Sequence, residues 1–181
     1  MLRKLLRIAR FTEFGQKYKF DEILLSRHTG RAFQQLVPTY DYSKIYKQWW
    51  YKTLEGKPDV CWPGVIKLFA LSSGTSESAS KYIPITKDLI RSNNITSIRH
   101  LFTLATYSNV RKRKSVSKGW LLLGGSTQLQ KGATYFAGDL SGIQAKNLPF
   151  WFQSFYKPGK KISKEKDWPK NPHLRDMFQC M

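Results

Sequence analysis

The sequence has 181 residues, with 31 Lys and Arg against 12 Asp and Glu, which gives a formal net charge of +19. This length allows one domain or part of a larger one, and 41% hydrophobic residues exclude a wholly disordered chain. Two cysteines, Cys61 and Cys180, exclude a disulfide scaffold and favour a reducing compartment, so we expect the cytoplasm. No apolar run reaches the roughly 18 residues of a bilayer-spanning helix, and we expect no membrane partner. His and Cys residues show no spacing typical of a zinc site.

The first third of the chain is predicted to be helical. A core-facing amphipathic helix is expected to end near Arg10, because four apolar residues recur at the spacing of one helix face: Leu2, Leu5, Leu6 and Ala9. This spacing, without a continuous apolar stretch, argues against a targeting peptide. A second helix is expected from about Asp21, with Gly30 as a breaker.

A further helix is predicted for Tyr42–Leu54, with Asp41 as its N-cap and Gly56 as its stop. Three adjacent aromatic residues lie in it, Trp49, Trp50 and Tyr51. Their helical spacing favours packing over a platform for stacked bases.

The remaining two thirds are predicted to alternate strands and helices. Strands are expected at Val65–Leu71, Lys81–Ile85 and Trp120–Leu123. Thr86 is expected to cap a helix to about Tyr107, with a possible interruption at Asn93–Asn94 and with these residues buried: Leu89, Leu101, Phe102 and Ala105. Another helix is expected to open at Ala137-Gly138-Asp139 and to run to about Asn147, with Asp139 interpreted as its N-cap. The alternation predicts an α/β fold, a mixed sheet flanked by helices.

The segment between the first two strands carries the clearest chemical signal. An apolar strand is followed by small hydroxyl residues, a glycine and a lysine: Ser72, Ser73, Gly74, Thr75, Ser76 and Lys81. Successive backbone N–H groups and hydroxyls in such a loop form a nest for anionic oxygens, and a lysine adds a compact positive charge. The spacing is neither GxxxxGK[ST] nor GxGxxG. Composition alone leaves two interpretations open, a phosphate site and an ordinary serine-rich loop.

The order of residues in this segment resembles a known family. Leu71-Ser-Ser-Gly-Thr-Ser, followed by Lys81-Tyr-Ile-Pro, is similar to the first nucleotide-binding motif of the Gretchen Hagen family, the auxin-responsive acyl acid amido synthetases. Several other segments resemble the family in the same order: Thr12–Tyr18, Val37-Pro38 with Tyr42, Trp62-Pro63-Gly64, Gly124-Gly125-Ser126, Gly138–Ser141 and Asn147–Trp151. The resemblance extends from about Leu5 to Tyr156, with Ser78 where plant members have glycine.

The resemblance implies an adenylate-forming ligase that uses ATP and Mg²⁺ to join a carboxylic acid to an amino acid. It assigns the nucleotide phosphates to Ser72, Ser73, Gly74, Thr75, Ser76 and Lys81. It implies no catalytic side chain and no metal ligand within this sequence, since the metal contacts would come from later motifs of the family. Residues 1–156 are expected to form the N-terminal part of the adenylate-forming domain, and residues 157–181 a basic, mobile tail. The family's two later nucleotide motifs and its C-terminal domain are not found in the sequence. We therefore expect an N-terminal fragment that is inactive by itself. Its expected partner is the missing remainder of the chain.

The charge distribution supports an alternative from another class. No acidic residue occurs from Leu89 to Gly138, and the tail is rich in lysine. This pattern is typical of a solvated basic surface, and it also permits phosphate contacts in a nucleic-acid-binding module. A non-functional remnant is the third possibility.

Overall fold

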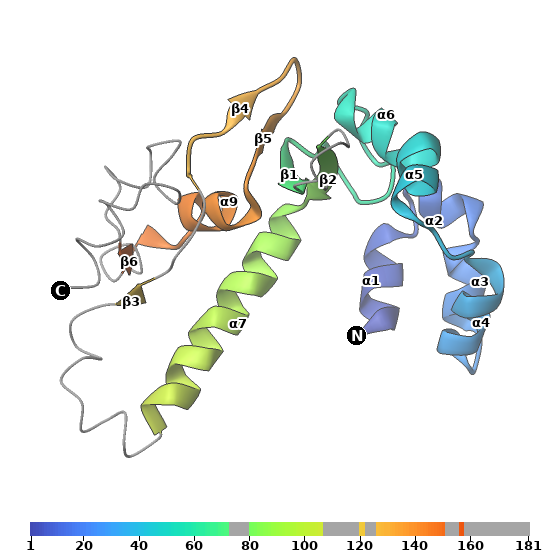
Figure 1. Cartoon of the computed structure of the whole chain (residues 1–181). Helices are drawn as coiled ribbons and strands as arrows, with labels where there is room; N and C mark the ends of the chain where they lie inside the picture. Colours follow the sequence, from blue (N-terminus) through green and yellow to red (C-terminus); the bar gives the residue numbers. More distant parts are fainter. Residues whose placement is uncertain (73–79, 107–119, 122–125, 151–155, 158–181) are drawn as a thin grey trace. The chain divides into compact units, whose positions relative to one another are not determined.

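The computed structural model describes residues 1–72, 80–106, 120–121, 126–150 and 156–157 (Figure 1). The chain divides into two compact units. Residues 1–67 and 133–135 form the first, which we call the helical unit, and residues 68–132 and 136–181 form the second, the sheet unit. The predicted mixed sheet flanked by helices is confirmed in the sheet unit.

The helical unit is built from short helices around a small apolar core. Its helical segments are α1 (Leu2–Ala9), α2 (Glu13–Lys17), α3 (Phe20–Leu25), α4 (Thr29–Leu36), α5 (Tyr42–Ile45), the π-helical η1 (Tyr46–Trp50) and α6 (Tyr51–Leu54). The last three are consecutive and make up the helix predicted over Tyr42–Leu54. Leu6, Ala9, Phe20 and Ile23 form the buried core, which joins α1 to α3.

Polar caps explain where several of these helices begin and end. The Thr12 Oγ1 atom accepts a hydrogen bond from the Gly15 N–H at 3.1 Å and so begins α2. The Asp41 Oδ1 atom accepts from the Lys44 N–H at 2.7 Å, which confirms Asp41 as an N-cap. Gly56 follows α6 with φ of +91°, a conformation that favours glycine, as expected for a stop.

Three sequence predictions for the helical unit are corrected. Gly30 does not break a helix but lies in the first turn of α4. The helix expected from about Asp21 is α3, which ends at Leu25 because the chain turns at residues 26–28, and α4 follows as a separate helix. Leu5 is 38% exposed, because the buried face of α1 is centred on Leu6 and Ala9.

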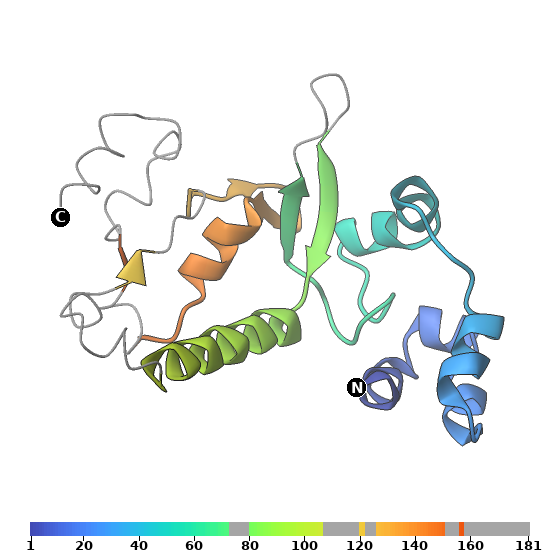
Figure 2. The same cartoon turned by 60° about the horizontal axis from the view of Figure 1, so that its bottom comes forward.

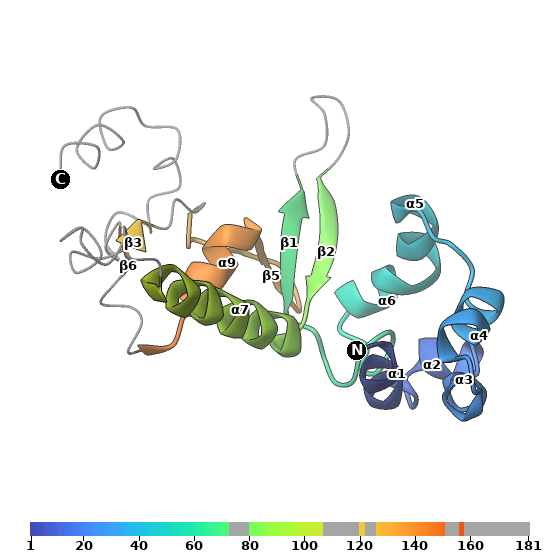
Figure 3. The same ribbon diagram turned by 90° about the horizontal axis from the view of Figure 1, so that it is seen from below.

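The sheet unit contains a four-stranded mixed sheet in the order β2-β1-β5-β4. Its strands are β1 (Leu68–Ser72), β2 (Lys81–Ile85), β4 (Gln130–Lys131) and β5 (Phe136–Gly138). β1 pairs antiparallel with β2 and parallel with β5, and β4 pairs antiparallel with β5. Figures 2 and 3 show β1 and β2 side by side as one hairpin. Pro84 lies in the edge strand β2, where proline is tolerated better than in a central strand.

Two helices pack on one face of this sheet, α7 (Lys87–Thr106) and α9 (Leu140–Lys146) (Figure 2). Ala70 and Ile85 of the hairpin form a buried cluster with Ile90 of α7 and Ile143 of α9. The Leu89 N–H donates to Thr86 Oγ1 at 3.0 Å, which confirms Thr86 as the cap of α7.

Other predictions for these helices are wrong. α7 is continuous through Asn93–Asn94. Leu89 is 40% exposed and Phe102 is 71% exposed, while the side chains of Leu101 and Ala105 lie outside the described part. Ala137 and Gly138 belong to β5, so the following helix begins only at Leu140. The buried Ile90 and Ile143 mark the faces of α7 and α9 that pack against the sheet.

A second, two-stranded sheet pairs β3 (Trp120–Leu121) in parallel with β6 (Tyr156–Lys157). It contains the first half of the strand predicted over Trp120–Leu123. Residues 122–123 and the tail from residue 158 lie outside the described part, so the predictions for them remain untested.

Candidate functional site

The candidate phosphate motif begins and ends on the β1–β2 hairpin. Ser72 is the last residue of β1, Lys81 is the first residue of β2, and the two are directly paired across the ladder. The two strands predicted on either side of the motif are therefore confirmed, although the first begins at Leu68 and not at Val65. Residues 73–79 lie outside the described part of the chain, and with them the predicted site residues Ser73, Gly74, Thr75 and Ser76.

The register places Ser72 and Lys81 on the same face of the hairpin. Side chains alternate between faces along a strand, and directly paired residues share a face with Cβ atoms about 5 Å apart. Ser72 therefore shares its face with Ala70, and Lys81 shares it with Ile83. Lys81 is exposed and Ser72 is half-buried. The hairpin thus brings a hydroxyl and an ammonium group to one end of one face.

The sequence explains why the hairpin forms here. Leu68 to Leu71 is a continuous apolar run, and Phe69 and Ala70 are buried between β2 and β5. The run stops where small polar residues begin, so the strand pairing ends at Ser72.

The parallel pairing of β1 with β5 brings a second segment to the same end of the sheet. Gly138 is paired with Ala70, which precedes Ser72 by two residues. Asp139 follows Gly138, and α9 begins at Leu140. Asp139 occupies the N-cap position of α9, as interpreted from the sequence, but its side chain makes no capping hydrogen bond. Carboxyl ends of parallel strands are a common place for ligands in α/β sheets.

The described residues contain no group of three or more His, Cys, Asp or Glu side chains that could hold a metal ion. Of the predicted site residues, the structure describes Ser72 and Lys81, a hydroxyl and a cation, and these two include no carboxylate of the kind that typically holds magnesium. The donor set suits anionic oxygens.

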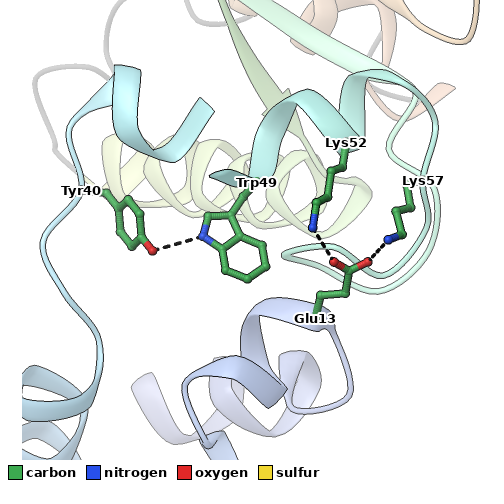
Figure 4. A network of polar contacts seen from close by, with 5 residues as sticks. All are labelled: Glu13, Tyr40, Trp49, Lys52 and Lys57. Carbon is green, nitrogen blue, oxygen red and sulfur yellow. Dashed lines mark hydrogen bonds and ion pairs between the residues drawn. The ribbon is translucent and has the colours of Figure 1, made fainter. Parts of the chain in front are cut away.

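The helical unit contains a polar network that the sequence analysis missed (Figure 4). Glu13 accepts from Lys52 Nζ at 2.9 Å and forms an ion pair with Lys57 Nζ at 2.5 Å. Hydrogen bonds from Lys57 and Lys52 lower the pKa of Glu13. These partners are about 40 residues apart in sequence, so no local spacing indicates the network.

Aromatic side chains pack beside this network. Trp49 is buried, its ring contacts those of Phe14 and Tyr18, and its Nε1 atom donates to the Tyr40 hydroxyl at 3.1 Å. The Tyr40 and Tyr18 hydroxyls also share a hydrogen bond. Burial, together with this hydrogen bond, raises the pKa of Tyr18 to about 12. The interpretation as packing residues is thus confirmed for Trp49, whereas Trp50 is half-buried and Tyr51 is exposed.

Cys61 also belongs to the helical unit. Burial, and after it the charge of Glu13, raise the pKa of the Cys61 thiol to about 12. A thiol with so high a pKa is a poor nucleophile near neutral pH, so Cys61 is no candidate for covalent chemistry. Among the residues that the structure describes, none of the helices combines the length and apolarity needed to cross a bilayer.

Comparison with known proteins bears on the whole chain. The model of the GH3 family N-terminal domain matches residues 1–178. The fold resembles that of a GH3.15 acyl acid amido synthetase, with a TM-score of 0.63 and 20% identity over 90% of this chain and 27% of that one. The AtGH3.15 acyl acid amido synthetase in complex with 2,4-DB gives a TM-score of 0.56 and 22% identity over 76% of this chain and 23% of that one.

The chain therefore spans about a quarter of the length of these two structures. No curated protein matches it. The family match covers nearly all of the sequence and agrees with the resemblance found in its motifs. The chain belongs to the GH3 family, the Gretchen Hagen family, and corresponds to part of its N-terminal domain.

Proposed function

We propose that this chain supplies the triphosphate-binding part of an ATP-dependent acyl acid amido synthetase. In this reaction a carboxylate oxygen attacks the α-phosphorus of ATP and releases pyrophosphate. The amine of an amino acid then attacks the carbonyl carbon of the acyl-adenylate, forms the amide bond and releases AMP. The single observation that carries the proposal is the pairing of Ser72 with Lys81 at the end of the β1–β2 hairpin.

This pairing gives the proposed roles a physical basis. The Ser72 hydroxyl and the Lys81 ammonium group share one face, where both can donate to the same phosphate group. We assign Ser73, Gly74, Thr75 and Ser76 to the same phosphates, through backbone N–H groups and hydroxyls. Positioning and charge neutralisation of this kind suit phosphoryl chemistry, which needs no side-chain nucleophile here.

The two reactants besides ATP follow from the family. Acyl acid amido synthetases join a carboxylic acid to an amine, and one structural neighbour is a complex with 2,4-DB. We propose a carboxylic acid and an amino acid as substrates of the complete enzyme, with part of the acyl pocket drawn from the Gly138–Phe150 segment. The reducing cytoplasm remains our proposed location.

The cofactor assignments differ in their support. The donors at the motif fit the phosphates of ATP, whereas the described residues provide no carboxylate cluster for Mg²⁺. When bound, Mg²⁺ would share the charge of the phosphate oxygens, and most of its ligands would be those oxygens and water. We also propose that this sequence alone forms no acyl-adenylate, because the two later nucleotide motifs are not found in it.

The test is titration calorimetry of the chain with pyrophosphate and with ATP at two salt concentrations. Lys81→Ala removes a charged hydrogen-bond donor worth about 1.5–3 kcal/mol, so binding should weaken roughly tenfold to a hundredfold. Lys131→Ala is the matched control, because Lys131 is an exposed lysine of the same sheet on the strand β4, at the opposite edge from β2. The affinity of the Lys131→Ala variant for either ligand should stay within about twofold of that of the unchanged chain.

If both variants lost affinity equally, and both losses disappeared at high salt, the binding would be diffuse charge attraction and the proposed site would be wrong. Tight binding of random-sequence RNA with a steep salt dependence would then favour the nucleic-acid alternative. No binding of either ligand would favour a non-functional remnant.

A further inference from the structure

Helix α1 has an apolar side that the core of the helical unit does not use. Leu6 and Ala9 are buried in that core, but Leu5 is 38% exposed, Ile8 37% and Phe11 69%. The spacing of three between Leu5, Ile8 and Phe11 makes them neighbours along the helix and the turn that follows it. We call these three residues the α1 patch.

Basic residues flank the α1 patch. Lys4 and Arg7 are exposed and precede Ile8 and Phe11 by four residues each, which places them beside the patch. Among the described residues neither forms an ion pair, and residues 1–12 include no acidic residue.

The other two arginines of this segment have partners within the unit. The Arg3 guanidinium donates to Thr29 Oγ1 and to the Leu24 carbonyl oxygen at 2.8 and 2.9 Å. Arg10 lies 4.4 Å from the centre of the Phe11 ring and 3.9 Å from an oxygen of Asp21. The structure thus leaves Lys4 and Arg7 as the charges presented beside exposed apolar groups.

We propose that the α1 patch, with Lys4 and Arg7, binds the surface of an anionic lipid bilayer. A helix that presents apolar side chains flanked by Lys and Arg is suited to the boundary between headgroups and acyl chains. The long stems of Lys and Arg can follow the apolar side chains inward while their charges stay among anionic headgroups. A net charge of +19 adds attraction at longer range.

The shape of the surface favours a bilayer over an acidic protein segment. The patch lies on the exposed surface of a single helix, which a bilayer accepts without a matching groove, whereas a protein partner requires shape complementarity. This proposal departs from our expectation of no membrane partner. That expectation rested on the lack of a spanning segment, and a helix lying on the surface does not span the bilayer.

The test is flotation of the full chain with vesicles of phosphatidylcholine alone or mixed with phosphatidylserine. Binding should require phosphatidylserine and should fall about tenfold or more in Leu5→Gln/Ile8→Gln and in Lys4→Glu/Arg7→Glu. Two matched controls should stay within about twofold. Leu25→Gln changes another apolar side chain of the unit that is 87% exposed, and Lys17→Glu/Lys47→Glu reverses two exposed charges elsewhere in it.

Circular dichroism of each variant is the control that tests whether the helices remain folded. Equal loss in both charge variants, with no loss in Leu5→Gln/Ile8→Gln, would show attraction to the overall charge and overturn the proposal. Equal binding to vesicles with and without phosphatidylserine, or binding to neither kind of vesicle, would also overturn the proposal. Lys81→Ala should float like the unchanged chain, so this result is independent of the proposed nucleotide site.

Discussion

Replacing Gly15 by alanine should destabilise the helical unit, although alanine is the better helix former. Gly15 lies within α2 and its φ is not positive, so backbone strain does not require glycine there. A Cβ atom at Gly15 would lie 2.1 Å from the carbonyl oxygen of Ala9, where ordinary contacts begin near 3.4 Å. Glycine therefore allows α2 to approach the end of α1.

The magnitude follows from what the added methyl group displaces. The Ala9 carbonyl oxygen accepts from the Thr12 N–H at 3.0 Å and from Thr12 Oγ1 at 2.7 Å, and Thr12 is the N-cap of α2. Overpacking costs about 1–3 kcal/mol, and a weakened hydrogen bond adds about 1 kcal/mol. The helix propensity of alanine returns about 1 kcal/mol. We expect a net loss of roughly 1–3 kcal/mol in the free energy of unfolding.

Urea unfolding followed by circular dichroism measures this loss, with Gly30→Ala as the matched control. Gly30 also lies in a helix with φ that is not positive, but a Cβ there would meet nothing within 4 Å. Gly30→Ala should therefore stabilise by about 0.4–1 kcal/mol. The packing argument is refuted if Gly15→Ala also raises the urea midpoint.

Three further outcomes follow from the helical unit. Asp41→Ala removes the hydrogen bond that caps α5 and should lower the free energy of unfolding by about 1 kcal/mol in the same urea assay; an unchanged midpoint would contradict the role of the cap. Because Lys57 and Lys52 lower the pKa of Glu13 in the folded state, its stabilising contribution is present above the unfolded pKa of about 4.5 and is lost as the pH falls through the folded value. Glu13→Gln should consequently be less stable than the unchanged chain at pH 7 and approach it in acid, whereas a constant difference would rule out this titration. With the other cysteine replaced by serine, the half-buried Cys61 thiol should react slowly with a thiol reagent at pH 8 and faster after urea is added, whereas equally fast labelling of the folded and unfolded chains would contradict the raised thiol pKa.

The sequence was most informative where a local pattern decides the structure. The apolar run that stops at small polar residues predicted the strands β1 and β2 on either side of the motif, and the structure adds that the two pair as a hairpin. Thr86 and Asp41 were identified as caps, because a capping bond joins residues three apart. The helix over Tyr42–Leu54 was also correct, although its π-helical middle leaves no clear mark in the sequence.

Predictions failed where distant packing decides the structure. Phe102 was expected to be buried from its apolar character, yet α7 packs through Ile90 and leaves Phe102 exposed. Ala137 and Gly138 were assigned to a helix, but pairing with β1, almost 70 residues earlier in the chain, makes them a strand. For the candidate site, the sequence grouped Ser72 with Lys81, whereas their direct pairing and the placement of α9 at the same end of the sheet required the strand registers.

The parallel pairing of β1 with β5 also affects how the chain is synthesised and folded. β2 leaves the ribosome soon after β1, so one edge of β1 can be paired early, but β5 follows only about 64 residues after β1 ends. At 5–20 residues per second, this delay is roughly 3–13 seconds. During that time the apolar strand that carries Phe69 and Ala70 has an open edge. We expect the nascent chain to be most prone to aggregation, and most accessible to chaperones, in the interval before β5 emerges.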